Sequence, residues 1–200
     1  MKLIEKSIAL ALILTVLFSF TGFAGQCEDI PDHVLRLHVL ANSDSDEDQA
    51  LKLKVRDRIL DETSELFVAA ESKEESIALA QSHLEQIKMA AEDEIQKQGY
   101  HYEVSVKLEE MYFTTRQYDN VSLPAGMYDA LRVEIGSGEG KNWWCVMFPP
   151  MCLPAAEEEQ ELEDVLSDSQ MDLVTESSYE VKWKVVEWYE QIRGWLAELL

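Results

Sequence analysis

One short stretch near the N-terminus carries most of the residues that could do chemistry. It reads LRLHVLANSDSDED over positions 35–48 and brings His38, Asn42, Ser43 and Asp44 close together. A histidine beside a serine and an acid is the residue set of a hydrolase, in which the imidazole activates the hydroxyl. The plainer interpretation is a turn, because Asn and Ser side chains bond nearby backbone and acids favour the start of a helix. We prefer the turn and keep the hydrolase as the alternative.

Three acids at alternate positions in this stretch, Asp44, Asp46 and Asp48, resemble the start of a calcium loop. Such a loop also needs glycine at its sixth position and glutamate at its twelfth, where this chain has Gln49 and Val55. The four histidines lack the close spacing of zinc ligands. We therefore expect no metal ion and no other cofactor.

A second polar stretch, GSGEGK at 136–141, has the composition of a phosphate-binding loop. The glycine spacing does not match that motif, and Asn142 stands where serine or threonine is required. Apolar, β-branched and aromatic residues flank the stretch, which predicts a strand on each side. We interpret it as the loop of a β-hairpin whose strands end at Ile135 and begin at Asn142.

The strand after this loop is apolar on both faces. Alternation places its side chains in two sets, Trp143, Cys145 and Met147 on one face and Trp144, Val146 and Phe148 on the other. A strand of this kind is either buried on both sides or covered by a partner, for which an exposed tryptophan is a strong contact. The sequence favours neither alternative clearly.

Hydrophobic periodicity predicts the elements that position these residues. Alternation predicts strands over 34–41 and 100–110, and apolar spacings of three and four predict helices over 46–67 and 73–98. The aromatic stretch 111–118 is expected to pair with the strand before it. We predict an α+β fold with a mostly antiparallel sheet of about four to five short strands, two long helices on one face, and a C-terminal amphipathic helix.

The ends of the chain differ from this α+β domain, which we place at 34–154. Residues 1–25 have a basic start, an apolar run and a small-residue exit, which is typical of a secretory signal or of a retained membrane anchor. Residues 155–178 hold nine acids and no base, which predicts a disordered linker. Residues 179–200 form one apolar seam, so this amphipathic helix packs on its own domain or docks into a partner.

The net charge narrows the choice of partners. A formal charge of −22, from 39 acidic and 17 basic side chains, argues against nucleic acid. It argues equally against anionic lipid, so membrane contact is expected only through an uncleaved N-terminal segment. In an oxidising compartment Cys145 and Cys152 can form a disulfide, although two buried thiols fit the sequence nearly as well.

Two of these stretches together resemble the stage II sporulation protein R family: LRLHVLANSDSDEDQALKLKVRD and PAGMYDALRVEIGSGEGKNWWCVMFPPMC. The likeness extends from about residue 35 to residue 152. It implies a non-enzymatic signalling protein of endospore-forming bacteria, exported into the space between forespore and mother cell. There such a protein activates a membrane-embedded aspartic protease of the mother cell, which cleaves the pro-form of sigma factor E.

From the resemblance and the strand pattern, we expect a partner-binding surface drawn from both stretches. The candidates are Arg36, His38, Asn42, Ser43, Asp44, Tyr128, Arg132, Asn142, Trp143, Trp144 and Phe148. The resemblance assigns a catalytic role to none of them. Two other functions stay open: an exported hydrolase that uses His38, Ser43 and Asp44, and a structural protein of the cell envelope.

Overall fold

The computed structural model describes most of the chain between the two ends. The described residues are 29–118, 121–151 and 165–175, with Ile4, Ser7, Ile8, Leu10, Ala11, Thr15, Cys27 and Leu162. The predicted signal at 1–25 falls largely outside them, and the predicted helix at 179–200 falls outside them entirely. In the part of the chain that is described, no helix is long and apolar enough to cross a membrane.

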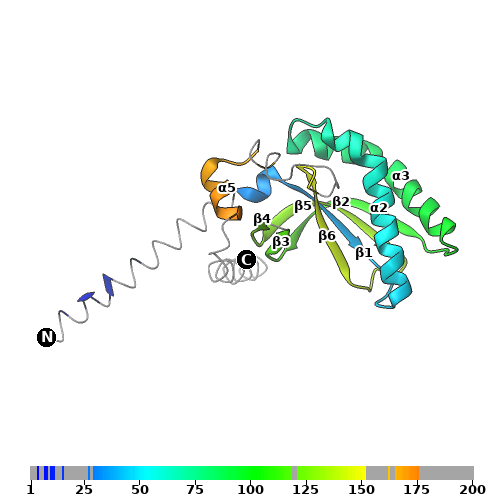
Figure 1. The fold of residues 1–200 in the computed structure, drawn as a ribbon, viewed down its shortest axis with the longest axis horizontal. Coiled ribbons are helices and arrows are strands. Elements are labelled where there is room, and N and C mark those ends of the chain that lie inside the picture. Colours follow the sequence, from blue (N-terminus) through cyan, green and yellow to red (C-terminus); the bar gives the residue numbers. More distant parts are fainter. Residues whose placement is uncertain are drawn as a thin grey trace, which may run out of the picture. The chain divides into compact units, whose positions relative to one another are not determined.

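The chain divides into two compact units, of which the larger holds the described residues of 31–112 and 127–166. It has the predicted α+β fold. Its elements are η1 (Ile30–His33), β1 (Leu35–Leu40), α2 (Asp46–Val68), α3 (Lys73–Lys97), β2 (Val104–Phe113), β5 (Gly126–Ile135) and β6 (Asn142–Phe148). The four strands form one mostly antiparallel sheet in the order β2-β5-β1-β6, with α2 and α3 on one face (Figure 1).

Contacts along β2 and β5 show that these two strands run in opposite directions. Glu109 pairs with Arg132 and Lys107 lies near Glu134, while the Glu103 carbonyl accepts a hydrogen bond from the Gly136 amide. One residue number falls as the other rises, which is the signature of an antiparallel pair. β1 and β5 are parallel, and β1 and β6 are antiparallel.

The hydrophobic core lies between the sheet and the two long helices. Its buried residues include Leu35, Leu37 and Val39 of β1, Leu131, Val133 and Ile135 of β5, Val55 and Ile59 of α2, and Ile87, Ala91 and Ile95 of α3. Each large side chain buried in this way contributes roughly 1.5–3 kcal/mol, so this layer is the main source of stability. Every residue of β1 is buried, because β1 has a strand on each side.

The predicted hairpin between β5 and β6 is wrong. β1 lies between these two strands and pairs with both, in parallel with β5 and antiparallel with β6. Residues 136–141 therefore cross the end of β1 instead of making a direct turn. Local alternation identifies two strands in opposite directions, but it carries no information on a third strand from much earlier in the chain.

The smaller unit gathers the described residues of 1–30, 113–126 and 167–200. Its two-stranded sheet pairs β3 (Arg116–Tyr118) with β4 (Val121–Leu123). The prediction that 111–118 pairs with the preceding strand is wrong, because β2 itself continues to Phe113 and its neighbour is β5. Aromatic and β-branched composition indicated strand conformation correctly and the partner strand incorrectly.

Helix α5 (Asp168–Thr175) also belongs to this unit and contacts β4. It lies inside 155–178, so the prediction of a disordered linker is wrong for this part. The Ser167 amide donates to Oε1 of Gln170 at 2.9 Å, which is the return bond of a capping box. Met171, Leu173 and Val174 are buried. The high acid content of the stretch obscured this short apolar face.

Lys73 connects three parts of the larger unit. Its Nζ donates to the Pro31 carbonyl oxygen at 2.9 Å and lies 2.8 Å from a carboxylate oxygen of Asp129 in β5. The Lys73 side chain is 11% exposed. A cation in the first turn of a helix opposes the helix dipole, so these two contacts explain why lysine stands there.

We expect Lys73→Ala to lower the free energy of unfolding by about 1–3 kcal/mol, because two partly buried acceptors lose a charged donor. Lys88→Ala is the matched control, since its pair with Glu92 is 3.9 Å long and half-exposed. That control should stay within about 0.5 kcal/mol of the wild type. Urea unfolding followed by circular dichroism measures both, and equal losses would contradict a special role for Lys73.

Candidate functional site

The two polar stretches singled out in the sequence meet at one end of the sheet. β1 and β5 are parallel, so residues 41–45 and 136–141 leave the sheet at the same end. We call 136–141 the crossover loop. Three of its residues bond the first stretch: Gly140 N donates to Ala41 O at 2.9 Å, Ser137 Oγ to Asn42 O at 2.6 Å, and Lys141 N to Asp44 Oδ1 at 2.7 Å.

Two glycines allow the crossover loop to lie this close. A Cβ on Gly136 would meet Asn42 Oδ1 at 2.3 Å, and the φ of Gly136 is 60°. A Cβ on Gly140 would meet the Ser43 carbonyl oxygen, also at 2.3 Å. Only glycine leaves room for the backbone at these positions. The glycine-rich composition therefore reflects close packing against residues 42–43 rather than phosphate binding.

The Asp48 side chain fixes the conformation of residues 42–43 through hydrogen bonds. Its Oδ2 accepts from Ser43 Oγ at 2.6 Å and from Asn42 Nδ2 at 2.9 Å, and its carboxylate also bonds Tyr102. Burial raises the pKa of Asp48, but the hydrogen bonds from Ser43, Asn42 and Tyr102 outweigh it and leave the pKa below the ordinary value of 3.8. This buried carboxylate is therefore ionised at neutral pH.

The spacing of Ser45 and Asp48 is that of a capping box, and the structure forms one half of it. Ser45 is the N-cap, and its Oγ accepts from the Asp48 amide at 3.2 Å. The Asp48 carboxylate turns to Asn42 and Ser43 instead of back to Ser45, whose amide bonds Ser43 Oγ at 3.2 Å. The spacing alone would make Asp48 a helix-capping residue, whereas the structure makes it the acceptor that orients two candidate site residues.

Lys52, which the sequence did not suggest, fixes the far end of the crossover loop. Its Nζ donates to the Lys141 carbonyl oxygen at 2.8 Å and to Gln49 Oε1 at 2.7 Å, and the residue is 4% exposed. Burial lowers the pKa of this amine; Asp44 raises it and Arg56 lowers it. Its place on the buried stripe of the helix was the one available signal, since a lysine there needs a buried acceptor.

The second face of the sheet, opposite α2 and α3, gathers several of the other candidates. Register places Arg132 and Trp144 on either side of His38, and Arg132 Nη1 donates to Glu109 Oε1 at 2.9 Å. Residues directly opposite one another share a face, so Glu109, Arg132, His38 and Trp144 form one row across four strands. Trp144 meets the His38 ring edge to face, with 5.8 Å between centroids.

His38 is positioned for structure rather than for proton transfer. Its Nε2 lies 2.7 Å from Asn142 Oδ1. Burial lowers the pKa of His38; the bond to Asn142 opposes this shift, and Arg132 adds to it. Ser43 Oγ, the nucleophile of the hydrolase alternative, donates to Asp48 and not to this ring. The geometry thus divides the supposed catalytic set between two separate hydrogen-bond networks.

Four candidates are too buried to present a surface, and His38, which is 4% exposed, is one of them. Arg36 and Tyr128 are fully buried, with the guanidinium carbon 4.9 Å from the ring centroid. Phe148 is 5% exposed and lies opposite Leu35, because the pairing of β1 with β6 shifts between Leu35 and Arg36. The irregularity moves Phe148 to the helix side, against the face predicted from alternation.

Trp143 and Cys145 are the remaining candidates on β6. Trp143 packs on the helix side of the sheet beneath Arg56, whose guanidinium carbon is 4.2 Å from the ring centroid. Cys145 is disulfide-bonded. Cys152 lies outside the described residues, so its pairing stays a prediction. Among the described residues, no group of three or more His, Cys, Asp or Glu side chains could hold a metal ion.

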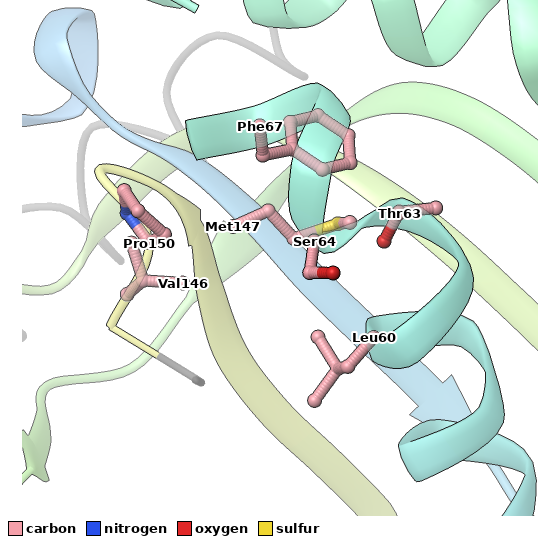
Figure 2. Close-up of a pocket in the computed structure, with 7 residues that line it drawn as sticks. All are labelled: Leu60, Thr63, Ser64, Phe67, Val146, Met147 and Pro150. Carbon is pink, nitrogen blue, oxygen red and sulfur yellow. The ribbon is translucent and has the colours of Figure 1, made fainter. Parts of the chain in front are cut away.

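An apolar pocket lies where the last turns of α2 face the end of β6 (Figure 2). Its lining is Leu60, Thr63, Ser64, Phe67, Val146, Met147 and Pro150. None of these side chains is acidic, basic or a histidine, so the pocket offers hydrophobic contact and no acid–base chemistry.

Comparison with known proteins gives a consistent result. The family model described as Stage II sporulation protein R matches residues 31–160. The protein named Stage II sporulation protein R in Bacillus subtilis (strain 168) is 35% identical over 185 residues, covering 82% of this chain and 83% of that protein. No solved structure matches the chain significantly.

We expect Asp48→Asn to lower the free energy of unfolding by about 2–4 kcal/mol at pH 7, because Ser43 and Tyr102 lose a charged acceptor. The pKa of Asp48 is lowered in the fold, so its contribution is present above about pH 4 and disappears as the pH falls through the folded value. The difference between wild type and variant should therefore shrink on acidification. Denaturant unfolding at pH 7 and near pH 3 measures it, and a constant difference would contradict this account.

We also expect Gly140→Ala to destabilise the fold by about 2–4 kcal/mol, because the new methyl group meets the backbone of Ser43 and the loop must shift. Gly138→Ala is the matched control, since its nearest neighbour would be Cβ of Glu134 at 3.6 Å, an ordinary van der Waals contact. Alanine at its φ of 64° costs about 1–2 kcal/mol from backbone strain alone. Thermal unfolding of both variants provides the comparison, and a larger loss at Gly138 would reverse the argument.

Proposed function

We propose that this chain, which belongs to the stage II sporulation protein R family, is an exported sporulation signal that activates a membrane-embedded aspartic protease. The family membership supports a role in sporulation, and the leader-like sequence at 1–25 supports export. In this proposal the protein acts in the space between forespore and mother cell, and the protease cleaves the pro-form of sigma factor E. The chain itself is a ligand and not an enzyme.

One observation carries the choice of ligand over hydrolase. Ser43 Oγ donates to Asp48 at 2.6 Å, and His38 Nε2 bonds Asn142 at 2.7 Å. A nucleophile needs a base within hydrogen-bond reach and a hydroxyl able to transfer its proton to that base. Here both side chains serve the packing of the crossover loop and of β6. The hydrogen bonds of Ser43 and His38 stabilise the conformation of a surface.

The surface that remains accessible is the crossover loop with its neighbours. Ser137, Glu139, Lys141 and Asn142 are exposed, as is Asp44. Their backbone is fixed by the bonds to residues 41–44, so a partner meets a preformed shape and loses little entropy on ordering it. We call this set, Asp44 with 137–142, the contact surface and propose that it touches the protease.

Activation then follows from differential binding. A ligand shifts a two-state protein only by the difference between its affinities for the two states. In our proposal the contact surface fits the active arrangement of the protease better than the idle one. A hundredfold preference, about 2.7 kcal/mol, would raise an active population of roughly 1% to about half.

Reconstitution tests the proposal. The protein is supplied outside cells that carry the candidate protease and its pro-sigma substrate, and cleavage is followed on a gel. We expect cleavage to depend on the added protein and to fall at least tenfold with Glu139→Lys, which reverses a charge in the contact surface without removing a described hydrogen bond. Glu85→Lys, an equally exposed reversal on α3, is the control.

The same assay separates the alternatives. Ser43→Ala removes one donor to Asp48, which costs about 1 kcal/mol of stability and leaves signalling within a few fold. A hydrolase would lose on the order of a thousandfold or more on losing its nucleophile. That large loss in a folded variant would establish the enzyme interpretation, and indifference of the protease to wild-type protein would favour an envelope protein.

A further inference from the structure

The outer edge of β2 is a second surface with a definite chemistry. β2 is ten residues long and stands at the end of the sheet, with β5 on its inner side. In the described part of the chain, no strand pairs with the outer side of residues 104–111. The backbone N–H and C=O groups along such an edge are a template for another strand.

The side chains along this edge form part of a charge pattern. Lys107 is 60% exposed and lies 3.9 Å from Glu134 of β5, and the half-exposed Glu109 bonds Arg132 of β5. Lys107 and Glu109 are two positions apart, so both lie on the second face of the sheet. From β5 outward to β2, one row therefore runs from acidic Glu134 to basic Lys107. The next row runs from basic Arg132 to acidic Glu109.

We propose that two copies of this chain associate edge to edge through β2, antiparallel, with Leu108 opposite the partner subunit's Leu108. Lys107 then lies opposite the partner subunit's Glu109, and Glu109 lies opposite the partner subunit's Lys107. Each row across the joined sheet alternates in sign: Glu134, Lys107, the partner's Glu109 and the partner's Arg132. A two-fold axis through Leu108 generates both rows at once.

The register follows from the charges. Sliding the partner strand by two residues keeps the two core faces on the same side of the joined sheet. It sets Lys107 opposite the partner subunit's Lys107, or Glu109 opposite the partner subunit's Glu109. Like charges directly opposite one another are destabilising. Sliding the partner strand by one residue would place the core face of one copy on the same side of the joined sheet as the second face of the other copy. Among the charged residues of β2 itself, only the Leu108-centred register pairs opposite charges, so the pattern favours a second copy over an unrelated strand.

Charge exchange tests this dimer. Full chains carrying two different affinity tags are mixed in mild detergent, and capture of one tag reports recovery of the other. Wild-type chains should co-purify, whereas Lys107→Glu or Glu109→Lys alone should reduce recovery about tenfold or more, because two attractive pairs become repulsive. Mixing the Lys107→Glu chain with the Glu109→Lys chain should restore recovery, since every cross-strand pair is then opposite again.

Each other result overturns the proposal. Lack of co-purification of wild-type chains at tens of micromolar excludes the dimer, and association that persists in both single variants places it elsewhere. Failure of the mixed variants to recover, with each shown to fold by circular dichroism, removes the charge argument. Glu85→Lys again serves as the control and should leave recovery unchanged.

Cross-linking checks the register without changing a charge. Leu108→Cys should form a disulfide-linked dimer on a non-reducing gel, because directly opposite residues in an antiparallel pair lie within disulfide range. Ser105→Cys should not cross-link to itself, since the register sets it opposite the partner subunit's Met111. Equal cross-linking by both variants would contradict the proposed alignment.

Discussion

The carboxylate of Asp48 is the interaction on which the polar end of the molecule depends. It sits below the chain at residues 42–43 and accepts from Asn42, Ser43 and Tyr102, so that the two small side chains have fixed orientations. These side chains and their backbone then receive the crossover loop. A buried anion is tolerated only where donors surround it, and here the donors are the residues that shape the surface.

The two faces of the sheet are specialised. The helix side is an apolar core that supplies stability, while the second face carries rows of charged, aromatic and amide side chains bonded to one another. Arg132 links these rows, because it reaches Glu109 and Glu134 and lies beside His38. Side chains that bond one another in this way present a defined shape to a partner.

The sequence predicted what is local and missed what is distant. The two long helices and the strands β1 and β2 follow from periodicity within single segments. The position of β1 between β5 and β6 could not be predicted, because strand partners are chosen over a separation of about a hundred residues. The same limit hid Lys52, whose acceptor is the carbonyl of Lys141. The face of Phe148 was missed because a bulge is invisible to alternation.

The central position of β1 in the sheet has a consequence for how the protein folds during its synthesis. A chain emerges from the ribosome starting at its N-terminus, so β1 and both long helices appear well before β5 and β6. β1 is apolar on the helix side; it gains its first neighbouring strand when β5 (to residue 135) has emerged and its second when β6 (to residue 148) has emerged. Folding of the larger unit is therefore a late event that depends on closing long loops. Until then the nascent chain is a substrate for chaperones and proteases, and a truncated product lacking β6 is recognisably incomplete.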